Sequence, residues 1–134
     1  MGQLQKIEST LLDLGFQVVA LSPDRPATLA PSVEEHQLTY TLLSDSRMEA
    51  SRAFGLAYKV DADTLARLKE YGADLEVASG EIHHELPVPA VFLVRTDGLI
   101  TFMYANPNYR VRLDPEVLLA AARAQQKEPA SADR

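Results

Sequence analysis

The strongest constraint in the sequence is a pair of apolar runs near its carboxyl end, Val91–Val94 and Leu99–Ala105, joined around Thr96-Asp97-Gly98. An Asp-Gly turn between two apolar runs is a strong signal for a β-hairpin. Pro89 stands just ahead of the first run. Proline is confined to the start or the edge of a strand because it has no backbone N–H group. We therefore expect a hairpin whose first strand begins close to Pro89.

The segments before the hairpin alternate between helical and strand patterns. Apolar side chains on a helical period predict a helix over residues 3–14, ended by Gly15. A continuous β-branched run at Phe16–Ser22 predicts a strand covered on both faces. A turn is predicted at Ser22-Pro23-Asp24, followed by a helix over residues 26–37 that starts or kinks at Pro31. A strand is predicted at Thr39–Asp45. Residues Ser44-Asp45-Ser46 then cap a helix at Arg47–Phe54, which Gly55 closes.

Residues 56–87 carry weaker signals. Asp63 or Thr64 can cap a helix that Gly72 ends, and residues 73–87 are predicted to be irregular loop. After the hairpin, Asp114 suits the N-cap of a closing helix and Pro115 suits its first position. The predicted order is helix, strand, helix, strand, two helices, two strands and a final helix, which defines an α/β chain.

Length and composition favour a single domain. The chain has 134 residues, of which 46% are hydrophobic, enough for one globular core. No linker or internal repeat divides it. We predict one domain over residues 1–123 and a disordered polar tail over residues 124–134.

Charge narrows the range of partners. A formal net charge of -6 and a sequence pI near 5.0 argue against nucleic acid and anionic membrane surfaces. No apolar run reaches the length that spans a bilayer, and the first residues lack the basic and apolar blocks of a signal peptide. These features predict no nucleic-acid or membrane partner and a cytoplasmic location.

The sequence contains no cysteine. This excludes disulfides, thiolate nucleophiles and cysteine-based metal sites within the printed residues.

Three segments in order carry a family resemblance: Val18–Asp24, Leu42–Leu56 and Val88–Phe102. Together they resemble the redoxin group, the peroxiredoxin-like proteins of the alkyl hydroperoxide reductase/thiol-specific antioxidant (AhpC/TSA) family. The chain is most similar to the branch whose members carry a thioredoxin-type Cys-x-x-Cys, and the similarity covers Leu4 to about Ala122. The resemblance implies an α/β, thioredoxin-like fold with a mixed sheet flanked by helices. It also implies a family activity of thiol–disulfide exchange or peroxide reduction, the chemistry of an antioxidant oxidoreductase.

The resemblance gives Val88 and Pro89 a role. Pro89 matches the family's cis-proline, so we expect a cis bond in a loop that lies beside the reactive dithiol and presents backbone groups to a partner. The alternative is a trans proline that only blunts the end of a strand.

The same resemblance predicts an N-terminally truncated thioredoxin-like fold. Residues 4–16 match the end of the helix that carries the dithiol, so the dithiol is expected about one to two helical turns before Met1. We therefore expect no catalytic residue, no cofactor and no metal in this chain, and no redox activity of the chain as given.

Loss of the strand before the dithiol is expected to leave two strand edges open. Open edges pair with other chains. We expect a homodimer through exposed sheet edges, strand exchange, or direct joining of the two flanking strands, and any further protein partner is unidentified. The alternative function is a non-enzymatic oligomeric binding module that kept the redoxin fold.

Other polar clusters offer weaker chemistry. His83 and His84 with Glu81 and Glu85 resemble a metal cluster, but adjacent histidines have no fixed convergence and zinc needs three or four converging ligands, so a solvated loop is favoured. Ser22, Asp24 and His36 could be offered as a hydrolase triad, but the Gly-x-Ser-x-Gly elbow is absent.

The remaining candidates are cationic and aromatic. Arg95, Arg110 and Arg112 do not stand where peroxiredoxins place the arginine beside their cysteine, so surface charge is the preferred interpretation. The side chains of Phe102, Met103, Tyr104 and Tyr109 are expected in the core or at its rim.

Overall fold

The computed structural model describes residues 2–127. The chain divides into two compact units, one made of Met1–Val18 and Pro89–Arg134 and the other of Val19–Val88. Each unit is α/β. The prediction of one domain over residues 1–123 stays a prediction.

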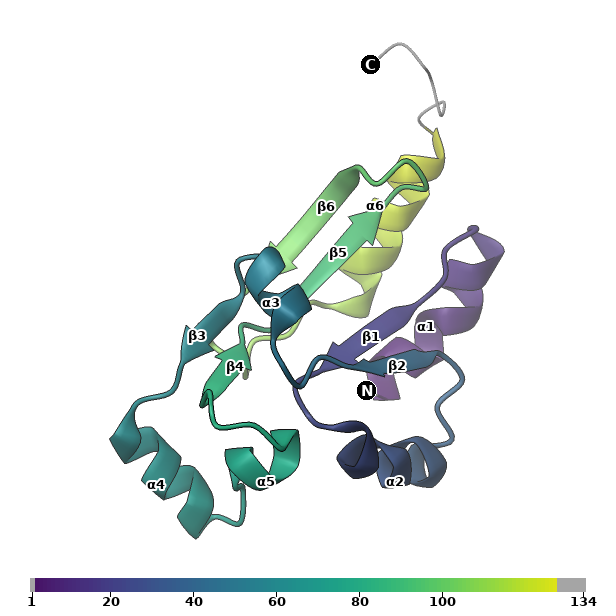
Figure 1. Ribbon diagram of the computed structural model, residues 1–134. Coiled ribbons are helices and arrows are strands. Elements are labelled where there is room, and N and C mark those ends of the chain that lie inside the picture. Colours follow the sequence, from purple (N-terminus) through teal and green to yellow (C-terminus); the bar gives the residue numbers. More distant parts are fainter. Residues whose placement is uncertain (1, 128–134) are drawn as a thin grey trace. The chain divides into compact units, whose positions relative to one another are not determined.

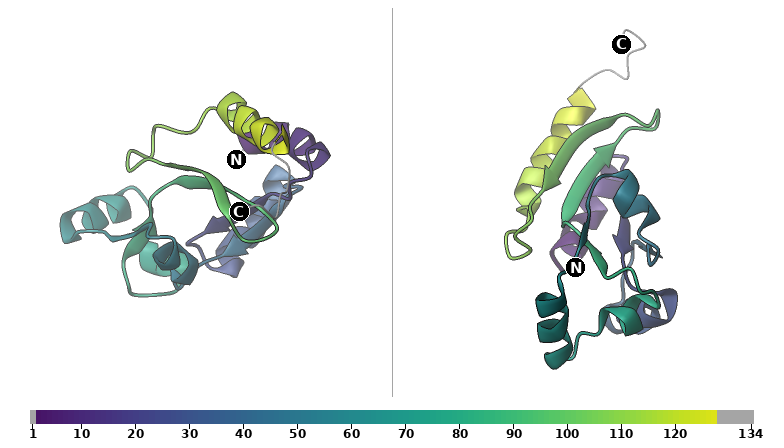
Figure 2. Two further views of the ribbon diagram at one scale, coloured as in Figure 1. Left: turned by 90° about the horizontal axis from the view of Figure 1, so that it is seen from above. Right: turned by 60° about the vertical axis from the view of Figure 1, so that its left-hand side comes forward.

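The first unit consists of two helices and a hairpin: α1 (Gly2–Asp13), β5 (Ala90–Val94), β6 (Ile100–Ala105) and α6 (Pro115–Lys127). The two strands pair antiparallel. Figures 1 and 2 show that α1, β5 and α6 run in the same direction, while β6 runs against them. The amino ends of α1, β5 and α6 therefore lie at one end of this unit.

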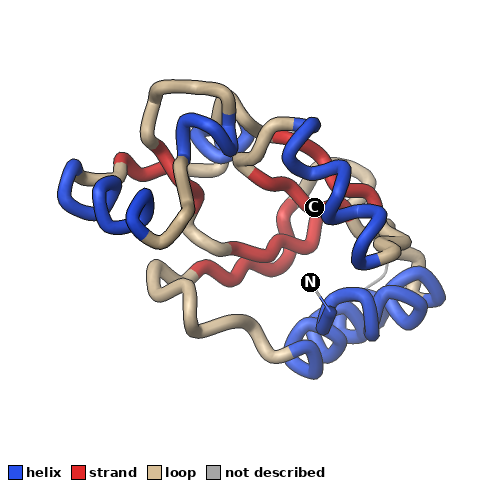
Figure 3. The backbone as a smooth tube through the Cα atoms, turned by 90° about the horizontal axis from the view of Figure 1, so that it is seen from below, coloured by secondary structure: helices blue, strands red, loops and turns tan. Residues whose placement is uncertain are grey.

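The core of this unit lies between the helices and one face of the hairpin. Its buried residues are Leu11, Leu93, Leu118, Leu119 and Ala122, and Val91 and Phe102 pack against them. Residues that alternate along a strand share one face of the sheet, and residues three or four apart share one face of a helix. This explains why β5 contributes Val91 and Leu93 and why α6 contributes Leu118 and Ala122. Figure 3 shows α1 and α6 side by side.

Local signals set the boundaries of these elements as predicted. Gly98 has a φ of 88° in the hairpin turn, a conformation that glycine adopts without strain. Asp114 accepts a hydrogen bond from the Glu116 N–H at 2.8 Å, and Pro115 is the first residue of α6. One prediction was wrong: α6 continues to Lys127, so residues 124–127 are helical. The rest of the predicted tail, residues 128–134, lies outside the described residues.

The second unit contains eight elements, listed in chain order. They are β1 (Val19–Ser22), α2 (Pro26–His36), β2 (Thr41–Ser44), α3 (Glu49–Ala53), β3 (Ala57–Lys59), α4 (Ala62–Glu70), α5 (Leu75–Ser79) and β4 (Glu85–Pro87). β1 pairs parallel with β2, and β3 pairs antiparallel with β4.

The sequence prediction missed three elements of this unit: β3, in a stretch for which no strand was predicted, and α5 and β4, within residues 73–87 that were expected to be irregular. The Asp74 carboxylate accepts hydrogen bonds from the N–H groups of Glu76 and Val77 and so starts α5. Leu86 in β4 pairs with Tyr58 in β3, which is a contact between residues far apart in the chain. Local patterns do not report such a pairing.

One helix start differs from expectation, and another decides between two predicted alternatives, because α2 does not begin at Pro31. The N-cap of α4 is Asp61, whose carboxylate accepts from the Thr64 N–H at 2.8 Å, and not Asp63 or Thr64. Helix α2 begins at Pro26 and contains Pro31 in its interior. Pro26 takes the first position because its missing N–H would have no partner there.

The described strands form three two-stranded sheets. Parallel and antiparallel strand pairing both occur, as in a mixed sheet, but the parallel pair and the antiparallel pairs belong to different two-stranded sheets. Among the described residues, β1 and β5 each have one paired edge and one open edge. Val19, Leu21 and Leu43 share one face of the β1–β2 pair and are 46%, 51% and 48% exposed. Parallel sheets are normally covered on both faces.

Candidate functional site

Val88 and Pro89 lie immediately before β5, where the two units of the chain meet in sequence. The Val88 N–H donates to the Leu56 carbonyl oxygen at 2.8 Å. The Pro89 carbonyl oxygen accepts from the Asn106 N–H at 3.2 Å. Because α1 and β5 run in the same direction, the start of β5, which Pro89 directly precedes, lies at the end of the first unit where α1 begins (Figure 1).

The expected cis bond at Pro89 was wrong. No peptide bond among the described residues is cis, so the Val88–Pro89 bond is trans. The trans isomer of an X–Pro bond is favoured by about 0.5–1 kcal/mol unless the surroundings select cis. Here the backbone hydrogen bonds to Leu56 and Asn106 fix Val88 and Pro89 on either side of the trans bond.

The two adjacent histidines have structural partners. His83 Nδ1 accepts from the Glu85 N–H at 3.0 Å, and His83 Nε2 lies 2.7 Å from the Ser46 carbonyl oxygen. Since Nδ1 is an acceptor, Nε2 must carry the proton and donate to Ser46. His84 has a φ of 54° and its Nε2 lies 2.8 Å from Glu76 Oε2. The segment is thus more than a solvated loop, because His83 ties the entry of β4 to the turn before α3.

The glutamates of this cluster pair with arginines. Glu85 accepts hydrogen bonds from the Arg52 guanidinium, which lowers the pKa of Glu85, and the same bonds raise the pKa of Arg52. Glu81 Oε1 lies 3.9 Å from Arg47 Nε. No group of three or more metal-ligating side chains converges within residues 2–127.

The possible triad residues are each engaged locally. Ser22 Oγ accepts from the Asp24 N–H at 3.2 Å, and His36 Nδ1 lies 3.0 Å from the Ser32 carbonyl oxygen one turn earlier. Burial raises the pKa of Asp24. In the described structure, no hydrogen bond connects the side chains of Ser22, Asp24 and His36 to one another. They therefore do not form a nucleophile–base pair.

Asp45 belongs to the predicted capping segment and bonds the first turn of α3, although the N-cap position itself is taken by Met48. Its Oδ1 accepts from the Ala50 N–H at 3.0 Å. Its Oδ2 accepts from the Ser51 N–H at 2.8 Å and from the Ser51 hydroxyl at 2.7 Å. Burial opposes ionisation, but the hydrogen bonds from Ser51 and Ala50 outweigh it, so the pKa of Asp45 is lowered. The role is structural, since this carboxylate holds the first turn of α3.

The arginines and aromatic residues fall into distinct environments. Arg95 Nη2 pairs with Asp97 Oδ2 at 3.0 Å beside the hairpin turn. Phe102 and Tyr104 are half-buried, in agreement with a core or rim position. The same expectation was wrong for Met103 and Tyr109, which are 62% and 61% exposed. Met103 alternates with Phe102 along β6 and therefore faces the other way.

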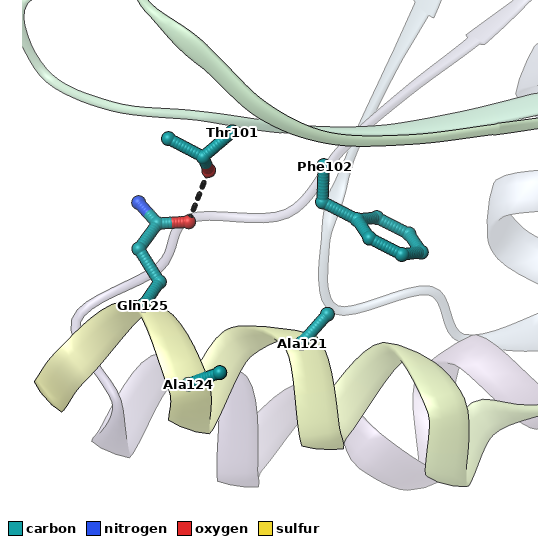
Figure 4. A pocket seen from close by; sticks show the side chains of 5 residues that line it. All are labelled: Thr101, Phe102, Ala121, Ala124 and Gln125. Carbon is teal, nitrogen blue, oxygen red and sulfur yellow. Dashed lines mark hydrogen bonds between the residues drawn. The ribbon is translucent and has the colours of Figure 1, made fainter. Parts of the chain in front are cut away.

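A small cavity lies in each of the two units of the described structure. The first, of about 230 Å³, lies between β6 and α6 and is lined by Thr101, Phe102, Ala121, Ala124 and Gln125 (Figure 4). The Thr101 hydroxyl donates to the Gln125 side-chain oxygen across it. None of the five lining side chains is ionisable, so this cavity offers no general acid or base that could activate the Thr101 hydroxyl.

The second cavity, of about 160 Å³, lies among α4, α5 and His84. Its polar side chains are already paired: Lys69 Nζ lies 3.7 Å from Asp74 Oδ2, and His84 contacts Glu76.

No helix among residues 2–127 is long and apolar enough to cross a bilayer.

The hairpin followed by a closing helix, together with a parallel β1–β2 pair linked by a helix, defines the class of the protein as α/β and thioredoxin-like. The chain belongs to the AhpC/TSA family, whose family model matches residues 1–103. This confirms the resemblance drawn from the three sequence segments.

One curated relative gives a more local comparison. The chain is 40% identical over 53 residues to a protein of Haemophilus influenzae named "Putative peroxiredoxin bcp". The match covers 40% of this chain and 34% of that protein, so it spans about a third of the relative's length.

Proposed function

We propose that this chain provides the scaffold of a peroxiredoxin-like, thiol-dependent oxidoreductase and that residues 1–134 alone perform no thiol chemistry. The observation that carries the proposal is the combination of family membership with a complete lack of cysteine. Thiol–disulfide exchange and thiol-based peroxide reduction both require a thiolate that attacks sulfur or a peroxide oxygen. The methionine thioethers cannot replace it, because they have no ionisable S–H group.

In this proposal Val88 and Pro89 form the loop against which a thiol-bearing segment lies. Support comes from the position of Pro89 directly before β5, whose first residue lies at the end of the first unit where α1 begins (Figure 1). A thiol at the amino end of a helix has a lowered pKa because of the helix dipole. A segment placed there would meet the Val88–Pro89 loop.

The test is a peroxide-reduction assay with the purified chain, thioredoxin, thioredoxin reductase and NADPH. We expect a rate equal to that of the mixture without the chain. A rate that scales with the concentration of the purified chain and survives removal of trace contaminants would contradict the proposal. Reading the genomic frame upstream of Met1 is the complementary test: an in-frame Cys-x-x-Cys supports the oxidoreductase, and stop codons support the alternative below.

The alternative is a non-enzymatic binding module that assembles through its strand edges. It is favoured by the open edge of β1 and by the exposed side chains of Val19, Leu21 and Leu43 beside it. Unpaired backbone groups on such an edge form hydrogen bonds with a strand of another chain. A homodimer through exposed sheet edges is compatible with both functions. A cytoplasmic location is proposed from composition, and fluorescence microscopy of a tagged chain in the source cells tests it.

Light scattering after size-exclusion chromatography tests the dimer. We expect a mass of twice the 14.8 kDa chain. Leu21→Lys places a charge beside the β1 edge and should shift the protein to monomer. Leu12→Lys is the matched control, because Leu12 is similarly exposed, at 53%, but lies on a helix, α1, and not on a strand. A wild-type monomer at all concentrations would count against edge pairing.

A further inference from the structure

The loop between β6 and α6 is held in a defined conformation by its own asparagines. Asn106 Oδ1 accepts from the Asn108 N–H at 2.9 Å, and Asn108 Oδ1 accepts from the Arg110 N–H at 3.1 Å. These are two successive Asx turns. The Asn106 N–H also donates to the Pro89 carbonyl oxygen at 3.2 Å, which attaches the loop to the start of β5.

This loop is basic in an acidic chain. Residues 106–114 carry two arginines, Arg110 and Arg112, against one acidic residue, Asp114, so the loop is net positive although the chain carries a net charge of -6. Both arginines are exposed, and no ion pair to either is present in the described part of the chain. The charges of this loop are therefore available to a partner.

Apolar and aromatic surface accompanies the charge. The Arg110 guanidinium lies 5.6 Å from the centroid of the Tyr109 ring, and its Nε donates to the Tyr109 hydroxyl at 3.3 Å. Tyr109 is 61% exposed and Val111 is 45% exposed. Tyrosine and arginine dominate the binding energy of many protein interfaces, and a loop fixed before binding loses little entropy when it binds.

We propose that Tyr109–Arg112, here called the Arg loop, is a docking surface for an acidic peptide segment of a protein partner. The arginines bind carboxylates, which the planar guanidinium can contact through two parallel hydrogen bonds. An apolar side chain of the peptide covers Tyr109 and Val111. A nucleic acid is a poorer fit, because it carries a phosphate at every nucleotide, whereas a peptide can limit its negative charge to the carboxylates that the arginines bind. The surface is independent of the thiol chemistry proposed above.

Fluorescence anisotropy with a defined probe tests this surface. The probe is a fluorescein-labelled dodecapeptide of alternating glutamate and leucine, and its control has glutamine in place of glutamate. We expect the full chain to bind the glutamate peptide at least tenfold more tightly than the glutamine peptide. Affinity should fall as salt rises from low to physiological ionic strength, because exposed charges are screened.

Three variants separate a specific surface from general electrostatics. R110E/R112E should weaken binding at least tenfold, and R110K/R112K should fall between it and the wild type, because lysine keeps the charge but loses the planar fork. R123E is the matched control, an exposed arginine of α6 outside the loop, and should bind like the wild type. Equal affinity for the two peptides, or equal weakening by R123E, would overturn the proposal. Displacement of the peptide by equimolar inorganic phosphate would also overturn the proposal, since it would indicate a site for small anions.

Discussion

Replacement of Asp45 by alanine is the sharpest test of how the second unit is held together. The Asp45 side chain is 8% exposed and accepts from the N–H groups of Ala50 and Ser51 and from the Ser51 hydroxyl. Alanine removes all three acceptor contacts and leaves two donors on Ser51, which is itself 8% exposed. A buried donor without a partner costs about 1–3 kcal/mol, and loss of a helix cap costs about 1 kcal/mol. The lost cap and the unpaired donors involve some of the same N–H groups, so these costs do not add in full. We expect Asp45→Ala to lower the free energy of unfolding by about 2–4 kcal/mol.

The pH dependence of stability provides a second, independent observable for Asp45. The folded-state pKa of Asp45 is lowered, so its contribution is fully present above the unfolded value of about 3.9 and is lost as pH falls through the folded value. Asp45→Asn keeps one acceptor oxygen but no charge. We therefore expect it to be less destabilising than alanine at pH 7 and to lack this part of the acid-induced loss.

Urea unfolding followed by far-ultraviolet circular dichroism measures both effects, because the chain contains no tryptophan for fluorescence. Asp63→Ala is the control, an exposed acidic residue in the first turn of α4. We expect the control to change stability by less than about 0.5 kcal/mol. The reasoning is refuted if Asp45→Ala unfolds like the control, or if Asp45→Asn shows the same stability loss on acidification as the wild type.

Three further substitutions test other parts of the fold. Leu118→Ala removes a 5%-exposed side chain from the α1–α6–hairpin core and should cost about 2–5 kcal/mol in urea unfolding; a cost below about 1 kcal/mol would mean that this core is not packed as described. Gly98→Ala forces a side chain into a φ of 88° and should lower the melting temperature, whereas Gly98→Asn should lower it less; the reverse order in calorimetry would contradict the turn geometry. Asp61→Ala removes the N-cap of α4 and should reduce helical circular dichroism, with Asp63→Ala as an unchanged reference; equal loss in both would show that Asp61 is not the cap.

The sequence predicted those elements whose signals are local. The helix over residues 3–14, the hairpin around Gly98 and the start of α6 at Pro115 were all confirmed. In each case a hydrophobic period is closed by a residue with a specific backbone preference, such as glycine in a positive-φ turn or proline at the first helical position. The family assignment was also confirmed, since all three segments on which it rests lie within residues 1–103, which the family model matches.

Sequence patterns failed where a structure depends on partners distant in the chain. β4 exists because Leu86 pairs with Tyr58, and its entry is fixed by His83 bonding to Ser46. Neither partner is visible in the local pattern of residues 73–87. The start of α5 could have been found, since Asp74 followed by a short apolar period is a capping signal.

The candidate site shows the same division. The absence of a thiolate and the position of Pro89 ahead of a strand follow from the printed residues alone, because cysteine content and strand-initiating proline are properties of composition and order. The isomer at Pro89, the hydrogen bonds that occupy both histidines and the open edge of β1 were decided by tertiary structure. Each of these depends on which distant backbone groups come within hydrogen-bonding distance, and chain order does not specify that contact.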